Sequence, residues 1–101
     1  MLEGVYEACL AYELEKRGLK VKRQMALSIV YDDLKVDNAF RIDLLVGDKV
    51  VIEIKAVDNL LLVHSAQLLS YLKLGRYKLG FLLNFNVVHM KNGIKRMVNG
   101  Q

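Results

Sequence analysis

Hydrophobic and polar positions divide the chain into helical and extended segments. Apolar residues recur at helical spacing near the N-terminus, where a basic last turn and Gly18 mark the helix end. Later segments alternate in polarity or are nearly continuously apolar, as β-strands do. The expected order is helix, three strands, helix, strand and short strand, at residues 2–17, 19–31, the hairpin 40–57, 59–74, 80–85 and 94–98.

The hairpin is the most informative segment, because its register follows from polarity. Val46 paired with Val50 around a three-residue loop places Asp43 directly opposite Glu53. A two-residue loop would mix polar and apolar residues on both faces, which is costly when one face is buried. The register therefore predicts an apolar face of Ile42, Leu44, Val46, Val50, Ile52 and Ile54, and an opposite face of Arg41, Asp43, Leu45, Val51, Glu53 and Lys55.

The second helix links the hairpin to the apolar strand at 80–85. A strand, a crossover helix and a further strand predict a parallel pair with a right-handed connection. We expect Asp58 or Asn59 to cap this helix, which runs to about Leu74. The predicted fold class is α/β, with a mixed central sheet flanked by helices in the order α-β-β-β-α-β.

The predicted face brings two carboxylates and an ammonium group together. Neighbouring carboxylates repel, so one takes up a proton unless a cation lies between them. Mg²⁺ prefers oxygen ligands and often binds one or two carboxylates together with phosphate oxygens. A lysine beside such an ion can orient water or a phosphoryl oxygen. Asp43, Glu53 and Lys55 therefore suit metal-assisted phosphodiester cleavage.

Composition limits the class of protein without identifying it. A chain of 101 residues, 53% hydrophobic, predicts one globular domain spanning residues 1–101. No apolar stretch is long enough to cross a membrane and no signal-peptide pattern is seen, so we expect a cytoplasmic protein. Cys9 is expected to be a small buried residue.

The net charge of +4 is compatible with a polyanionic partner. Two basic clusters could track phosphates, although each is also explained as a solvated face. They comprise Lys16, Arg17, Lys20, Lys22 and Arg23 in the first cluster, and Lys91, Lys95 and Arg96 in the second.

Asp43 with Glu53-Ile54-Lys55 resembles the core motif of the PD-(D/E)XK nuclease superfamily, although Ile42 stands where the motif name has proline. Gln67 and Tyr71 are similar to the extra Gln-x-x-x-Tyr motif of RecB-like nucleases. Glu3-Gly-Val-Tyr6 resembles the second half of the signature that names the GxxExxY proteins. Relative to that family the N-terminus is expected to be truncated, because the signature glycine would precede Met1.

The resemblance implies a restriction-endonuclease-like fold and roles for individual residues. Asp43, Glu53 and the carbonyl of Ile54 would hold Mg²⁺ or Mn²⁺, and Lys55 would position or deprotonate the attacking water. Glu3 would be a further metal-adjacent carboxylate; the alternative is a glutamate favoured by the helix dipole. Glu7 and Glu13 are expected to be solvated or salt-bridged.

Four residues are candidates for substrate binding. The resemblance implies this role for Gln67 and Tyr71, which share one stripe of the second helix with His64. Arg41 joins them because it shares the predicted polar face with Asp43. The alternative to substrate binding is that this stripe is a solvent-exposed helix face at the domain surface.

The sequence thus predicts a metal-dependent nuclease that acts on nucleic acid, with DNA as the expected substrate and a homodimer as the expected form. The alternative is a non-catalytic module that binds nucleic acid or protein and retains the nuclease fold.

Overall fold

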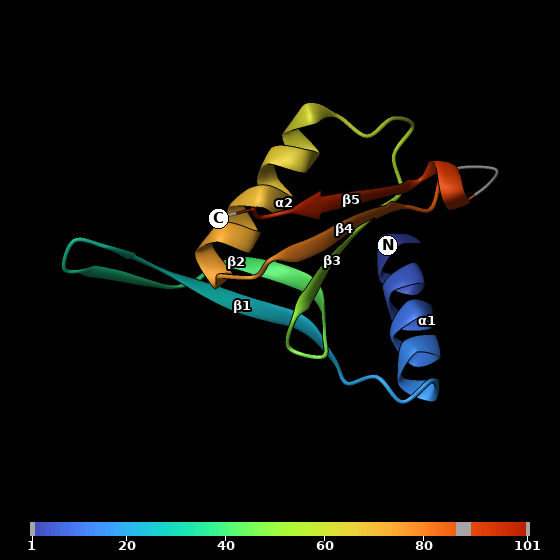
Figure 1. Cartoon of the computed structure of the whole chain (residues 1–101), viewed down its shortest axis with the longest axis horizontal. Coiled ribbons are helices and arrows are strands. Elements are labelled where there is room, and N and C mark those ends of the chain that lie inside the picture. The colour runs from blue at the N-terminus through green and yellow to red at the C-terminus, as the bar shows by residue number, and fades with distance from the viewer. Residues whose placement is uncertain (1, 87–89, 101) are drawn as a thin grey trace.

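The computed structural model describes residues 2–86 and 90–100 and confirms the predicted order of elements (Figure 1). The elements are α1 (Leu2–Lys16), β1 (Val21–Tyr31), β2 (Leu34–Val46), β3 (Val50–Lys55), α2 (Leu62–Gly75), β4 (Leu79–Asn84), the 3₁₀ turn η1 (Met90–Asn92) and β5 (Ile94–Val98).

One mixed sheet organises the molecule. Its five strands lie in the order β1-β2-β3-β4-β5. β3 and β4 are parallel, from Val50 opposite Leu79 to Lys55 opposite Asn84, as the crossover helix predicted. The other neighbouring strands are antiparallel. The fold is therefore the expected α/β class with a mixed central sheet.

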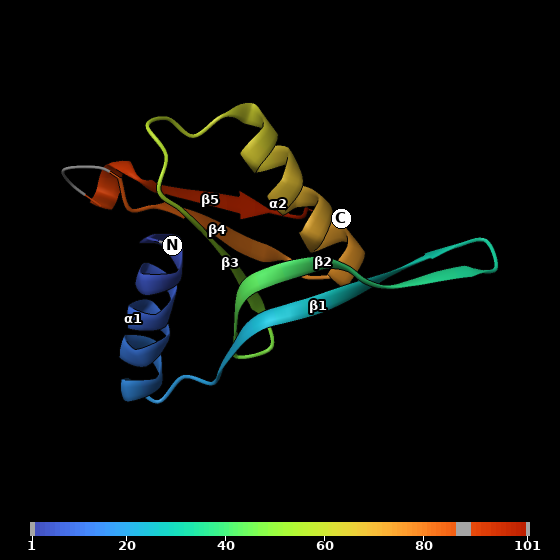
Figure 2. The same ribbon diagram turned by 180° about the vertical axis from the view of Figure 1, so that it is seen from behind.

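The two helices cover opposite faces of this sheet. On one face, Leu68 and Leu72 of α2 are fully buried against residues that include Val51 and Leu82. On the other face, Ala11 of α1 is buried in a second cluster. Figure 2, which turns the molecule around, shows the sheet between the two helices. The central strands are thus covered on both sides, and a site between the helices is partly shielded from solvent.

The predicted hairpin register is confirmed, because Val46 pairs with Val50 and Leu44 with Ile52 around a three-residue loop. The predicted apolar face is wrong at Ile42. Ile42 packs with Leu45 under α2, whereas Leu44 packs on the α1 side. The neighbouring strand explains the change: Gln24 has φ 52°, and the β1–β2 ladder passes from Arg23–Leu44 to Met25–Ile42 without a Gln24–Asp43 pair. Both strands change faces at this point.

Beyond the core, β1 and β2 continue as a two-stranded arm, residues 28–38, which projects away from both helices (Figures 1 and 2). Its turn is Asp32-Asp33. Val30 and Tyr31 near the tip are 70% and 75% exposed. The arm is therefore a solvated extension of the sheet.

Two local predictions are wrong. α2 begins at Leu62, after both expected capping residues, and Asp58 instead accepts a hydrogen bond from Asn86. The first turn is closed by His64, whose Nδ1 accepts a bond of 2.9 Å from the backbone nitrogen of Leu61.

Cys9 is exposed because it lies on the outer side of α1, away from the buried Glu7 and Ala11. Among the described residues, no helix is long and apolar enough to cross a membrane.

Candidate active site

Asp43 on β2 and Glu53 on β3 face each other across the gap that follows the paired part of the hairpin. The backbone nitrogen of Asp43 donates to Oε2 of Glu53 at 3.0 Å. The backbone nitrogen of Ile54 donates to Oδ2 of Asp43 at 2.8 Å. In a regular ladder these nitrogens would donate to backbone carbonyls of the neighbouring strand. Here the carboxylate side chains accept the two bonds instead. This arrangement holds the two carboxylates side by side, as the register predicted.

Burial makes both carboxylates reluctant to ionise. Glu53 is 5% exposed, and this burial, reinforced by the charge of Asp43, raises the pKa of Glu53 to about 8. Burial also raises the pKa of Asp43, although the hydrogen bond from Ile54 opposes the rise. The positive charge of Lys55 opposes the rise in the pKa of both carboxylates but does not cancel it. The pair is therefore a site where an added cation would be favourable.

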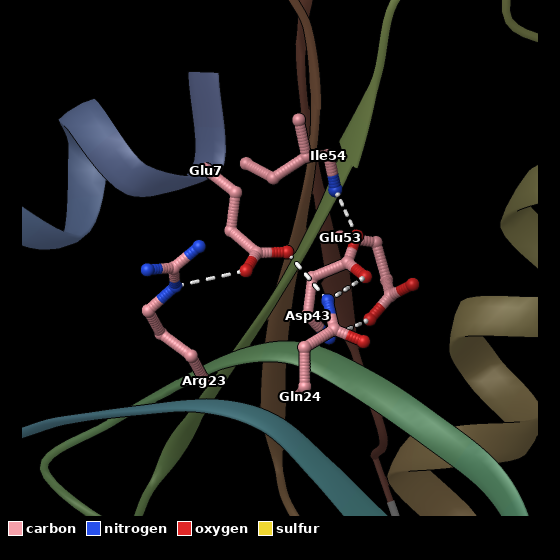
Figure 3. Close-up of polar contacts among 6 residues, drawn as sticks. All are labelled: Glu7, Arg23, Gln24, Asp43, Glu53 and Ile54. Atoms are coloured by element: carbon pink, nitrogen blue, oxygen red, sulfur yellow. Dashed lines mark hydrogen bonds and ion pairs between the residues drawn. The ribbon is translucent and has the colours of Figure 1, made fainter. Parts of the chain in front are cut away.

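Glu7 of α1 is a third carboxylate at this site, a position that was not predicted from the sequence. It is 5% exposed, and its Oε2 accepts a hydrogen bond of 2.9 Å from Nε of Arg23. Its Oε1 accepts one of 2.6 Å from Nε2 of Gln24, which also reaches Oδ1 of Asp43 at 3.4 Å (Figure 3). Of the two expected states, solvated or salt-bridged, Glu7 has the second, and it is buried.

A signal for Glu7 was present in the helical spacing. The buried and half-buried side of α1 carries residues at offsets of three and four, with Glu7 in the middle of the stripe: Tyr6, Glu7, Leu10, Ala11 and Leu14. A carboxylate on an apolar stripe needs a partner inside the protein. That requirement points from α1 toward the strands.

A divalent cation fits the donor chemistry of this site. Oδ2 of Asp43 and Oε2 of Glu53 are engaged by backbone nitrogens, whereas Oδ1 of Asp43 has only the long contact from Gln24. Within residues 2–86 and 90–100, no three His, Cys, Asp or Glu side chains converge as a ready-made metal cage. Two carboxylates with a backbone carbonyl, completed by water or phosphate, are the kind of set that Mg²⁺ accepts.

The other predicted catalytic and metal residues lie at or beside the end of β3 but differ in exposure. Lys55 ends β3 and is half-buried beside Asn84 of β4. The main chain of Ile54 lies between Glu53 and Lys55, and its side chain is buried on the α1 side. Glu3 is exposed, and its Oε2 accepts a long bond of 3.3 Å from the nitrogen of Ala56. Glu3 thus borders the end of β3, one helical turn from Glu7.

The four predicted substrate-binding residues differ in exposure, although three of them lie on α2. Tyr71 is buried on α2 and packs against Phe40, with ring centroids 5.5 Å apart. Burial, followed by the charges of Glu53 and Asp43, raises the pKa of Tyr71. Gln67 is exposed on α2, Arg41 is exposed on β2, and His64 is engaged at the start of its helix.

The first predicted basic cluster is largely engaged in ion pairs. Arg17 pairs with Glu13, and Arg23 pairs with Glu7. Lys20 and Lys22 both lie 3.0 Å from the carboxylate of Asp48 at the hairpin tip. Lys95 and Arg96 of the second cluster lie exposed on β5. The first cluster is therefore mostly paired with carboxylates, whereas Lys95 and Arg96 are compatible with the alternative of a solvated face. The side chain of Lys91 lies outside the part of the chain that the structure describes.

Comparison with known proteins agrees with this architecture. No curated protein matches the chain. A solved structure titled "Crystal structure of SSO0001" is similar, with a TM-score of 0.72 and 20% identity over 96% of this chain. The chain spans 50% of that structure's length, and at this identity the likeness shows the fold. The family model described as "PD-(D/E)XK nuclease superfamily" matches residues 1–97. The mixed sheet is thus a restriction-endonuclease-like core, and the chain belongs to the PD-(D/E)XK nuclease superfamily.

Proposed function

We propose that the protein is a divalent-metal-dependent nuclease that hydrolyses phosphodiester bonds. The observation that carries the proposal is the pairing of the half-buried Asp43 with the buried Glu53 through two backbone nitrogens, next to Lys55 in the chain. Burial of two adjacent carboxylates is unfavourable unless a proton or a cation compensates their charge. Family membership supports a nucleic acid as the source of the phosphodiester.

Different residues of the chain would hold the metal, orient the water and position the carboxylates. Asp43, Glu53 and the carbonyl of Ile54 would hold Mg²⁺ or Mn²⁺. When bound, such an ion stabilises charge on a phosphoryl oxygen and acidifies water. Lys55 would orient the attacking water or a phosphoryl oxygen, and its charge favours the ionised carboxylates. Glu7, through Gln24, would hold Asp43 in place, and Glu3 would border the site.

Substrate contacts belong on the α2 side of the acidic pair. Gln67 is exposed on α2 and would bond a nucleotide, whereas the buried Tyr71 would form the wall of the site. Arg41 is exposed near Asp43 in the chain and would contact phosphate. His64 would have to release the nitrogen of Leu61 to use Nδ1, so only Nε2 is available for a substrate. We propose DNA as the substrate and a homodimer as the acting form, since a domain of this size has little surface to grip a duplex.

A cleavage assay tests the proposal. Labelled single-stranded DNA, duplex DNA and RNA are incubated with the protein in Mg²⁺, Mn²⁺ or EDTA, beside the variant Lys55→Ala. We expect cleavage that requires metal and is lost in the variant. Lys95→Ala, which removes an exposed lysine of β5, is the matched control and should cut like the wild type. Absence of cleavage together with metal-independent binding of nucleic acid would favour a non-catalytic binding module.

A further inference from the structure

Positive charge is concentrated at the end of the sheet where β3 and β4 begin. We name this surface the basic end. It consists of Lys20, Lys22, Lys49, Lys73, Arg76 and Lys78. All six side chains are exposed. They come from four places: the residues around the start of β1, the hairpin loop, the end of α2 and the turn into β4. The fold therefore gathers them from distant parts of the chain.

Two adjoining hollows are formed at the basic end. The first has a volume of about 430 Å³, apolar walls that include Val50 and Leu79, and a rim that carries Lys49, Arg76 and Lys78. The second is lined by Lys73, Arg76, Lys78 and Asn99. Asp48 is the one acidic residue that lines either hollow, and Lys20 and Lys22 already bind its carboxylate at 3.0 Å. The cations of the two hollows have no carboxylate partner within the described part of the chain.

The backbone of Arg76 gives an independent reason to assign a role to its side chain. Arg76 follows the end of α2 with φ 60°, the left-handed conformation that glycine usually adopts at this position. A residue with a Cβ is less favourable there than glycine. A strained, exposed arginine at the junction of two hollows is therefore a candidate for ligand binding.

We propose that the basic end binds backbone phosphates of a nucleic acid, at a distance from the catalytic carboxylates. This inference rests on the proposed nuclease function, which supplies the class of ligand. Val50 lines the first hollow and lies three residues before Glu53 on β3, a separation of about 10 Å along a strand. A bound strand covers that distance in about three nucleotides. The basic end thus anchors the substrate beside the site where it is cut.

An acidic segment of a second copy is the competing occupant. The arm tip carries Asp32 and Asp33, while Asp37 lies 3.6 Å from Lys35 of the same arm. Two adjacent carboxylates would neutralise only part of a row of cations spread over two hollows. A polyanion with regularly repeated charges matches such a row better. The geometry therefore favours nucleic acid.

Binding measured without cleavage tests this inference. The anisotropy of labelled DNA and RNA is followed in EDTA over a range of salt concentrations, for the wild type and for Lys49→Gln/Lys78→Gln. We expect the double variant to lose tenfold or more in affinity, and the slope of log affinity against log salt to fall by about two. The matched control is Lys16→Gln/Lys95→Gln, which removes the same charge elsewhere. Equal affinities of the two double variants would overturn the inference.

Arg76→Gly separates a binding role from a structural one. Glycine suits the left-handed conformation, so this variant should be at least as stable as the wild type in thermal melting. We expect its affinity for nucleic acid to fall several-fold. A variant that binds as the wild type does would contradict the role of the side chain.

The outcomes also separate this inference from the proposed function. If the protein cuts nucleic acid and the basic-end variants bind like the control, only the anchoring role fails. If the protein never cuts but binding depends on the basic end, only the nuclease function fails. If the wild type is a dimer that Lys49→Gln/Lys78→Gln dissociates without weakening nucleic-acid binding, the occupant is the arm of a second copy and the inference is wrong.

Discussion

Nε2 of Gln24 lies 2.6 Å from Oε1 of Glu7 and ties α1 to the sheet at the point where β1 and β2 change faces. The same nitrogen is 3.4 Å from Oδ1 of Asp43, so one amide separates two carboxylates. Replacing this donor by a carboxylate adds a fourth acidic group to Glu7, Asp43 and Glu53. We expect Gln24→Glu to lower the free energy of unfolding by roughly 1–3 kcal/mol at neutral pH, measured by urea denaturation.

The matched control is Gln24→Gly, which suits the positive φ and adds no charge. Its loss of stability should be smaller, and the penalty of Gln24→Glu should shrink in acid, where the carboxyl groups bind protons. An equal penalty for Gln24→Glu at neutral and acid pH would show that the amide does not separate charges.

Stability without metal should decrease as the pH rises from about 4.5 to about 8, the interval between the ordinary and the raised pKa of Glu53. Because the folded-state pKa lies above that of the unfolded chain, the folded state binds the proton more tightly over this interval. This contribution is complete below the lower value and is lost as the pH passes the upper one. Asp43, whose pKa is also raised, acts in the same direction. The free energy of unfolding should fall by a few kcal/mol, about 1.4 per unit of pKa difference.

Glu53→Gln removes the main titrating group of this effect and keeps a side chain of similar shape. Its stability should therefore vary much less with pH over the same interval in denaturation experiments with EDTA. Glu15→Gln, on the exposed side of α1, serves as the control and should retain the wild-type profile. A wild-type stability that rises over this interval would contradict the burial of a protonated Glu53.

Tyr71 is a core residue as well as the proposed wall of the site. It is 6% exposed and contacts Phe40, so Tyr71→Ala should lower stability by about 3–5 kcal/mol in urea denaturation. Tyr71→Phe keeps the ring and should cost much less. Tyr12→Ala, at a residue that is 64% exposed on α1, is the control and should change stability little. Similar losses for Tyr71→Ala and Tyr12→Ala would show that the ring of Tyr71 is not a core contact.

Much of the fold was predictable because the chain alternates polarity regularly in its hairpin. Leu44, Val46, Val50 and Ile52 share a face as expected, and this fixed the loop length and the approach of Asp43 to Glu53. The parallel pairing of β3 with β4 followed from the intervening helix.

The position of Ile42 was not predictable from alternation. The faces change at Gln24, where a residue other than glycine adopts a positive φ, and no local sequence signal marks that choice. The same feature brings Gln24 toward Glu7. The link between Glu7 and Asp43 therefore depends on tertiary packing, and the sequence pattern showed only that Glu7 lies on the apolar side of its helix.

The start of α2 illustrates a second limit. Asp58 and Asn59 are good capping residues, yet the helix begins three residues later because Asp58 bonds Asn86 and His64 closes the first turn. Asn86, which is distant in sequence, thus takes the carboxylate that would otherwise cap the helix. The basic end likewise became visible only once the fold had brought its six residues together.

Thermal melting in Mn²⁺ or Mg²⁺ tests the central claim, that Asp43 and Glu53 form a cation site. An ion that binds only the folded state raises the melting temperature as its concentration increases. We expect this rise for the wild type at a pH near 8, and its loss in Asp43→Asn and Glu53→Gln, with Glu15→Gln behaving as the wild type. A melting temperature that does not respond to either ion, or that responds equally in all variants, would contradict the account.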